Sequence, residues 1–297
     1  MLKTGQTVKF RHFTMDLAAV NSLLIISVAF VCLLGLPQPS HAGVEWSGKI
    51  NPANPTTWTR STDAFIGNGT LNITNSGAVY GHIFAIGSAS GSTGEVTVSG
   101  AGSTLTSDAE VDVGSVGNGT LKIIDGALVN SSIGGRIGSN SLGSTGEVTV
   151  DGAGSTWMVG SVLSLGREGS GTLNIANGGL VATESLEINE NGNGYGVISM
   201  STGGMLALYG DTDGSLLDFL DPIYGTKDIR YWDDYISDWA DITAAKYGED
   251  YTLSYKTDGD LTGYTVLTVG VIPEPSTLTG LLGLCLAGLL GSLRRKR

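Results

Sequence analysis

A repeat of about 25 residues constrains the fold of this chain more than any other feature of its sequence. Each repeat begins with glycine, then any residue, then an apolar, a polar and a second apolar residue. This five-residue pattern starts at Gly69, Gly94, Gly119, Gly146, Gly171 and Gly196. Apolar residues that alternate with polar ones predict a β-strand rather than a helix. A chain with such a period folds as stacked units, because one unit cannot bury its apolar face alone.

Two further apolar sites follow the first strand of each unit. The second site is occupied by Val79, Leu105, Val129, Trp157 and Val181. The third site, usually just before another glycine, is occupied by Ile86, Val113, Ile137, Leu165 and Ile188. Three short strands separated by turns of Gly, Asn and Ser predict one rung of a solenoid. We therefore expect an all-β fold, a parallel β-helix or β-solenoid of about six rungs, over residues 65–208.

The alternation also predicts which side chains point into the solenoid. The expected interior residues are Leu71, Ile73, Val96, Val98, Leu121, Ile123, Val148, Val150, Leu173, Ile175, Ile198 and Met200. They would stack like on like in rungs ~4.8 Å apart, which makes six rungs ~29 Å long. The polar residues between them are expected to form an exposed ladder of Asn72, Thr97, Lys122, Thr149, Asn174 and Ser199. The unit at Gly196 lacks the Ser-Thr-Gly-Glu sequence that occurs at 92–95 and 144–147. This difference predicts a terminal rung.

The first 42 residues have the order of a secretory signal peptide. Lys3, Lys9 and Arg11 precede an apolar run at 17–36, and Ala42 ends a small-residue pattern. This order predicts a signal helix that directs export by the Sec route and is cleaved after Ala42. The apolar run is close to spanning length, so an uncleaved membrane anchor is the alternative.

The last 27 residues contain three elements in a fixed order. Pro273, Glu274 and Pro275 come first, followed by an apolar stretch at 276–293. The chain then ends in a basic cluster of Arg294, Arg295, Lys296 and Arg297. At ~1.5 Å per residue the apolar stretch is ~27 Å long as a helix, just enough to span a membrane. The basic cluster predicts a transmembrane helix that leaves residues 43–270 outside the cytoplasm.

This tail resembles the PEP-CTERM sorting signal of Gram-negative bacteria. The resemblance implies that Pro273, Glu274 and Pro275 are recognised by exosortase, a transpeptidase-like membrane enzyme. It implies that the helix and the basic cluster hold the chain only transiently in the inner membrane. The protein would then reach the outer surface or an extracellular matrix that contains exopolysaccharide. A permanent tail anchor is the alternative.

The repeats resemble those shared by autotransporter passengers and PEP-CTERM-associated proteins. The matching residues are 67–73, 86–87, 91–105, 117–123, 137–138, 143–157 and 171–175. The resemblance implies a surface or matrix rod, and it supplies no catalytic residue.

Charge and residue counts exclude several kinds of chemistry. Residues 43–276 contain 9 basic and 27 acidic residues, so we expect no nucleic-acid partner. The two cysteines, Cys32 and Cys285, lie in the terminal apolar segments. The same central region has one histidine, His82, which any Ser-His-Asp triad would have to use. We therefore expect no cofactor and no thiolate or histidine-rich metal site there.

Residues 209–270 combine aromatic and acidic residues, and we expect them to cap the solenoid. Residues 43–64 are expected to cap the other end. A calcium loop at Asp211 and Asp213 is an alternative, although the later ligands of an EF-hand are missing. A second alternative is a carbohydrate-binding module within 209–247, in which Trp232 and Trp239 stack on sugar rings. Solenoid edges can also pair end to end, which would give weak self-association.

Enzymatic activity is not expected. Some β-helices degrade polysaccharides, and such sites need convergent carboxylates. Glu95 and Glu147 recur two rungs apart, ~10 Å, which is too far to meet directly. We therefore expect an exported, non-enzymatic structural or adhesive protein of the surface or matrix, with a polysaccharide-degrading β-helix enzyme as a remote alternative.

Overall fold

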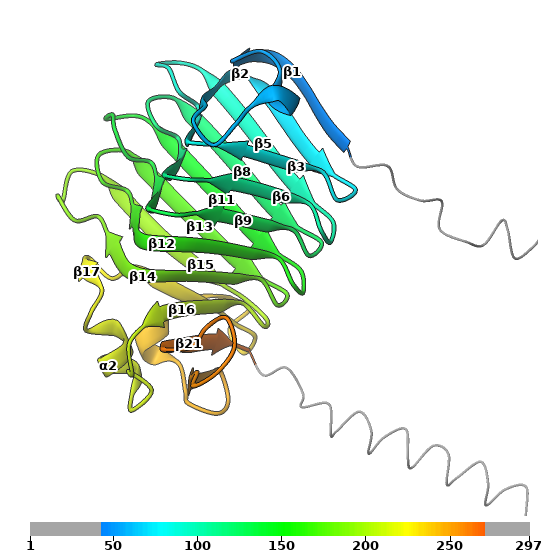
Figure 1. Cartoon of the computed structure of the whole chain (residues 1–297). Coiled ribbons are helices and arrows are strands. Elements are labelled where there is room, and N and C mark those ends of the chain that lie inside the picture. The colour runs from blue at the N-terminus through cyan, green and yellow to red at the C-terminus, as the bar shows by residue number, and fades with distance from the viewer. Residues whose placement is uncertain (1–42, 271–297) are drawn as a thin grey trace, which may run out of the picture. The chain divides into compact units, whose positions relative to one another are not determined.

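The computed structural model describes residues 43–270 of the chain. These residues form an all-β parallel solenoid whose strands stack in regular order (Figure 1). Within this range each rung contributes one strand segment to each of three faces. The predicted fold class is therefore confirmed, with about six rungs. The predicted signal helix and transmembrane helix lie outside the described residues. Among the described residues, no helix has the length and apolarity needed to cross a membrane.

Face 1 contains the strands that begin with the repeated glycine. They are β2 (Asp63–Thr74), β5 (Thr93–Ser99), β8 (Asn118–Ile124), β11 (Thr145–Asp151), β13 (Ser170–Ala176) and β15 (Tyr195–Met200). All neighbouring pairs are parallel, and the repeated glycines lie opposite one another, as Gly119 lies opposite Gly146. The period of the sequence therefore sets the register of the sheet.

Face 2 contains the strands of the second apolar site. They are β3 (Ala78–Gly81), β6 (Thr104–Ser107), β9 (Leu128–Ser131), the first half of β12 (Thr156–Leu165), the first half of β14 (Leu180–Ile188) and β16 (Met205–Tyr209). Face 3 contains the start of β2, then β4 (Ile83–Ile86), β7 (Glu110–Val113), β10 (Gly134–Ile137), the second halves of β12 and β14, and β17 (Tyr224–Gly225). Both faces are parallel over these strands.

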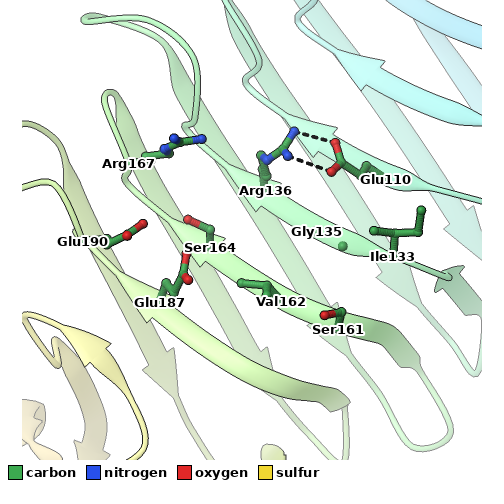
Figure 2. Close-up of a pocket in the computed structure, with 11 residues that line it drawn as sticks. Glu110, Ile133, Gly135, Arg136, Ser161, Val162, Ser164, Arg167, Glu187 and Glu190 are labelled. Atoms are coloured by element: carbon green, nitrogen blue, oxygen red, sulfur yellow. Dashed lines mark hydrogen bonds and ion pairs between the residues drawn. The ribbon is translucent and has the colours of Figure 1, made fainter.

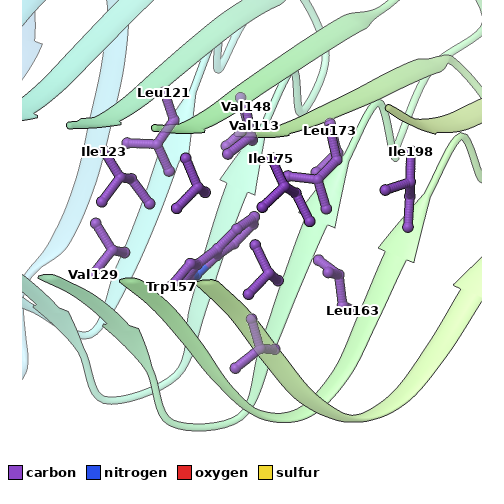
Figure 3. Close-up of a cluster of buried hydrophobic side chains, with 14 of the residues drawn as sticks. Val113, Leu121, Ile123, Val129, Val148, Trp157, Leu163, Leu173, Ile175 and Ile198 are labelled. Carbon is purple, nitrogen blue, oxygen red and sulfur yellow. The ribbon is translucent and has the colours of Figure 1, made fainter. Parts of the chain in front are cut away.

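The interior is a continuous apolar core. The predicted inward residues of face 1 and the predicted apolar sites of faces 2 and 3 are all buried. Trp157 is the largest fully buried side chain among the described residues, and its indole lies at the centre of the aliphatic side chains in Figure 3. Its Nε1 donates a hydrogen bond to Oγ of Ser131 over 3.2 Å. A Cβ on Gly135 would lie 2.7 Å from Cζ2 of Trp157, so the missing side chain at Gly135 makes room for the indole.

The glycine that follows the third strand makes the rung turn. Gly138 has φ +70°, and a Cβ there would lie 2.3 Å from the carbonyl oxygen of Ser170 in the next rung. A side chain is therefore excluded both by the backbone conformation and by the approach of the neighbouring rung. Asn189 occupies the equivalent position after β14, with φ 49°. Asparagine is one of the few other residues that tolerate this region.

The N-terminal end of the stack is covered by an antiparallel strand. Strand β1 (Gly43–Asn51) pairs with β2 along faces 1 and 3. A short 3-10 helix, η1 (Pro55–Thr57), follows it, and the next residue, Trp58, packs against Phe84 with ring centroids 6.0 Å apart. This segment covers apolar side chains of the first rung, which has no preceding rung to cover them.

The C-terminal end is closed on two faces by different pairings. On face 2, β21 (Tyr264–Val269) runs antiparallel to β16, and β20 (Tyr251–Tyr255) is antiparallel to β21. On face 1, β18 (Ile229–Asp233) continues the parallel stack and turns back through β19 (Asp238–Asp241). The helix α2 (Leu216–Leu220) buries Phe219, and the 3-10 helix η2 (Ile242–Ala244) buries Ile242.

The expected exposed ladder on face 1 differs from the structure. Asn72, Thr97, Lys122, Thr149 and Asn174 are half-buried, because each lies between two neighbours of the same row. Ser199 is buried, with only 2% of its surface exposed. The cause is the cap, since Arg230 of β18 lies opposite Ser199 and its Nε donates to the serine Oγ over 2.9 Å.

The turn geometry predicts that Gly138→Ala destabilises the solenoid more than Gly143→Ala. Gly143 also has a positive φ, +92°, but a Cβ there would meet nothing within 4 Å. Backbone strain alone should lower the free energy of unfolding of Gly143→Ala by about 1–2 kcal/mol. In Gly138→Ala the steric clash should lower it further. Urea unfolding midpoints of the full chain in mild detergent measure the difference. Equal midpoints for the two variants would show that the rungs do not approach as closely as described.

Candidate functional site

A groove on the outside of face 3 is the first candidate site in the described part of the chain. It has a volume of about 290 Å³ and crosses β7, β10, β12 and β14 (Figure 2). Gly134 faces outward and carries no side chain, so the surface is hollowed beside it. The groove is lined by Glu110, Ile133, Gly134, Gly135, Arg136, Ser161, Val162, Ser164, Arg167, Glu187 and Glu190.

One wall of the groove is an ion pair held in place by buried groups. Nη2 of Arg136 lies 2.7 Å from Oε1 of Glu110, and its Nη1 contacts the other carboxylate oxygen. Nη1 also lies 3.9 Å from Oδ2 of Asp112. Asp112 is buried and accepts hydrogen bonds from Oγ of Ser139 at 2.8 Å and Nδ2 of Asn140 at 3.1 Å. The bidentate geometry fixes the plane of the Arg136 guanidinium.

Ser164 lies on the floor of the groove. In the sheet it is in register with Arg136 of the preceding rung and with Glu187 of the following rung. Its side chain is only 6% exposed, and its Oγ has no hydrogen-bond partner among the described residues. A buried hydroxyl without a partner is unfavourable, and native structures contain few of them.

Two carboxyl groups form the opposite wall. Burial raises the pKa of Glu187 above its ordinary value, and the negative charge of Glu190 and a hydrogen bond with it raise the pKa further. The positive charges of Arg167 and Arg136 act in the opposite direction. Glu187 therefore holds its proton to a higher pH than an isolated glutamate and can donate a hydrogen bond when protonated.

Sequence reasoning did not find this groove. A signal was present, because Asp112, Arg136, Ser164 and Glu187 each precede the apolar residue of the third site. Aligning the repeats at that site places the four residues in one outward row, which the sheet register confirms.

The predicted tryptophans come together in the β18–β19 hairpin. Trp232 and Trp239 lie opposite each other, with ring centroids 5.5 Å apart and planes at 81°. The guanidinium carbon of Arg230 lies 5.0 Å from the ring centroid of Trp239, within cation-π distance. Trp232 is 38% exposed and Trp239 is half-buried. The hairpin thus presents an aromatic surface with one accessible indole.

An acidic cavity of about 410 Å³ lies beside this hairpin. It is lined by Tyr231, Trp232, Asp233, Asp234, Tyr235, Glu249, Asp250 and Gly270. Burial raises the pKa of Tyr231, and the charges of Asp250 and Asp233 raise it further. The Tyr231 hydroxyl lies 3.3 Å from Oδ2 of Asp233 and can donate to it. Aromatic rings beside carboxylates can stack on a sugar ring and accept hydrogen bonds from its hydroxyls.

The other predicted residues are dispersed. Asp211 and Asp213 lie in the turn after β16, and within residues 43–270 no three Asp, Glu, His or Cys side chains gather as a metal site. Nδ1 of His82 lies 2.9 Å from Oδ1 of Asp63 at an exposed position.

Glu95 and Glu147 lie two rungs apart in one row, separated by Thr120. Glu95 pairs with Lys122 over 2.7 Å, and Glu147 accepts a hydrogen bond from Asn174 over 3.1 Å. The cleavage residue Ala42, the motif residues Pro273, Glu274 and Pro275, and the basic cluster Arg294, Arg295, Lys296 and Arg297 lie outside the described residues.

Comparisons with known proteins identify the C-terminal tail. Residues 271–296 match the family model of the PEP-CTERM protein-sorting motif. The predicted resemblance is therefore confirmed, and the motif indicates an exported protein that is sorted to the cell envelope or surface.

The repeats are similar to parts of two larger proteins. The Adhesin BmaC autotransporter of Brucella suis biovar 1 (strain 1330) is 33% identical over 105 residues, which are 34% of this chain and 3% of the adhesin. The Uncharacterized lipoprotein YdeK of Escherichia coli (strain K12) is 37% identical over 139 residues, 45% of this chain and 10% of the lipoprotein. The matches thus span a tenth or less of each relative. No solved structure matches the chain significantly.

The raised pKa of Glu187 predicts a pH effect on stability. The folded chain holds this proton more firmly than the unfolded chain, so the contribution of Glu187 to stability falls as the pH rises above its ordinary pKa. Glu187→Gln removes this decline, and the variant should gain stability relative to the wild type between about pH 4 and pH 7. Urea unfolding at both pH values measures the gain. Glu184→Gln, at an exposed position of the same strand, is the control, and an equal gain there would contradict the assignment.

Proposed function

We propose that this chain is an exported, non-enzymatic structural and adhesive protein of the bacterial surface or exopolysaccharide matrix. One observation carries the proposal: a sorting motif at 271–296 follows a solenoid whose two ends both carry antiparallel strands. Covering the ends limits open-ended pairing of the stack, so the solenoid can act as a rod of defined length.

The sorting step involves the membrane and one enzyme. An exosortase-type enzyme recognises Pro273, Glu274 and Pro275, while the apolar stretch and Arg294 to Arg297 hold the chain at the inner membrane. Removal of the tail then releases the rod towards the outer surface. The similarity of the repeats to a part of an autotransporter adhesin supports the surface role.

The charges of the solenoid support a non-enzymatic role. Two of the three cations within residues 65–208 are paired, Lys122 with Glu95 and Arg136 with Glu110. Cations that are already neutralised by carboxylates are poorly placed to stabilise the charge that develops when a polysaccharide is cleaved.

The sorting proposal predicts the mass of the mature protein. Wild-type protein recovered from its native cells should lack residues 1–42 and the tail beyond 273–275, and should lie outside the inner membrane. Glu274→Ala should keep the tail and remain in the inner membrane, because the recognised motif is broken. Intact-mass spectrometry of each cell fraction tests this, with Glu249→Ala as a control for loss of an acidic residue. Wild-type protein that retains Arg294 to Arg297 in the inner membrane would instead be a tail-anchored protein.

A second candidate function is carbohydrate binding by the cap. The paired indoles of Trp232 and Trp239, next to Arg230 and the acidic cavity, favour it, because aromatic surfaces beside polar groups suit sugar rings.

This candidate predicts that Trp232→Ala and Trp239→Ala together reduce retention on insoluble polysaccharide. The loss should be severalfold, since each residue contributes stacking surface. A pull-down with insoluble polysaccharide from the native matrix measures retention. Tyr195→Ala removes an exposed aromatic side chain away from the hairpin and is the matched control. Unchanged retention of the double variant would exclude the hairpin as the binding surface.

A further inference from the structure

We propose that the groove on face 3 binds a short segment of a neutral polysaccharide, with Ser164 at its floor and Arg136, Arg167, Glu187 and Glu190 around it. The inference deepens the proposed function and rests on it, because a rod in an exopolysaccharide matrix is in contact with polysaccharide chains. It assigns the binding to the solenoid itself and not to the aromatic hairpin of the cap.

The first argument is the unsatisfied hydroxyl of Ser164. The side chain is 6% exposed and lines the groove, and its Oγ has no partner among the described residues. A hydroxyl can both donate and accept a hydrogen bond. The hydroxyl group of a sugar is the matching partner, since it also offers both roles.

The second argument is the charge of the groove. Its lining residues carry two guanidinium groups and three carboxyl groups, and Arg136 is already paired with Glu110. An anion bound at Ser164 would meet the carboxyl groups of Glu187 and Glu190, and a metal cation would meet Arg136 and Arg167. A neutral ligand with many hydroxyls uses both kinds of group, because carboxylates accept and guanidiniums donate.

The third argument is the shape of the site. The groove volume of about 290 Å³ lies near the lower end of small-ligand pockets, which suits one or two sugar units. Gly134 leaves one side open, and Ile133, 53% exposed, adds apolar surface for the C–H face of a sugar. Figure 2 shows the charged side chains arranged around Ser164.

The experiment is a binding titration of the full chain in a detergent without a sugar headgroup. The neutral probes are hexasaccharides of dextran, cellulose and mannan, and the charged probes are oligogalacturonate and chitosan oligomers. At least one neutral probe should bind the wild type. Ser164→Leu, which fills the floor, and Arg167→Gln, which removes an exposed donor, should each weaken that binding at least about tenfold.

Matched variants separate the groove from other effects. Thr149→Leu introduces the same leucine side chain at a half-buried outward position of face 1 and should leave binding unchanged. Arg167 is exposed, so Arg167→Gln keeps the test valid if Ser164→Leu fails to fold. Binding should also survive replacement of Trp232 and Trp239. The proposal is overturned if no neutral probe binds, if only charged probes bind, or if Thr149→Leu weakens binding as much as Arg167→Gln.

The two proposals fail separately. Sorting and tail processing do not depend on the groove, so Arg167→Gln should reach the same cell fraction with the same processed termini as the wild type. Loss of oligosaccharide binding with normal sorting would confirm that the groove, and not the export route, was changed. An absence of processing in a wild type that still binds a neutral probe would overturn the sorting proposal alone.

Discussion

Every rung of this solenoid depends on its neighbours to cover its edges. A single rung of about 25 residues exposes two rows of backbone groups and encloses too few side chains to exclude water. Stacking solves both problems together, because parallel strands pair their backbones and bring like residues into contact, as Leu121 meets Val148 and Ile123 meets Val150. The glycine after the third strand follows from the same constraint, since the neighbouring rung approaches too closely for any side chain there. The first and last rungs lack one neighbour each, and antiparallel strands replace it.

The repeating part of this fold could be predicted from the sequence, and the reason is physical. A fixed period places equivalent residues at equivalent positions of every rung. A correct assignment of one rung therefore predicts the interior residues of all the others. The caps have no repeat, and their contacts join residues far apart along the chain, such as Ser199 and Arg230, or Tyr209 and Tyr264. Nothing in the sequence of 251–269 indicates that β21 turns back against β16. The burial of Ser199 was missed for the same reason.

The two candidate surfaces differ in how far sequence could predict them. Trp232 and Trp239 are seven residues apart in one hairpin, so a local excess of aromatic residues was sufficient to point to them. The groove is assembled from four rungs, and each rung contributes between one and four side chains that look ordinary alone. Its hollow also depends on Gly134, an outward position where a side chain would lie beside Glu110.

The constant register of face 1 has a consequence for how such chains change. Residues 91–98 and 143–150 have the same sequence and the same place in a rung, so a crossover between them would remove 52 residues and leave every remaining strand in register. Recombination between repeats can therefore lengthen or shorten the molecule by whole rungs while both caps and the sorting motif stay intact. The length of the solenoid can thus change during evolution by duplication or deletion of repeats, and the core residues of each rung stay the same.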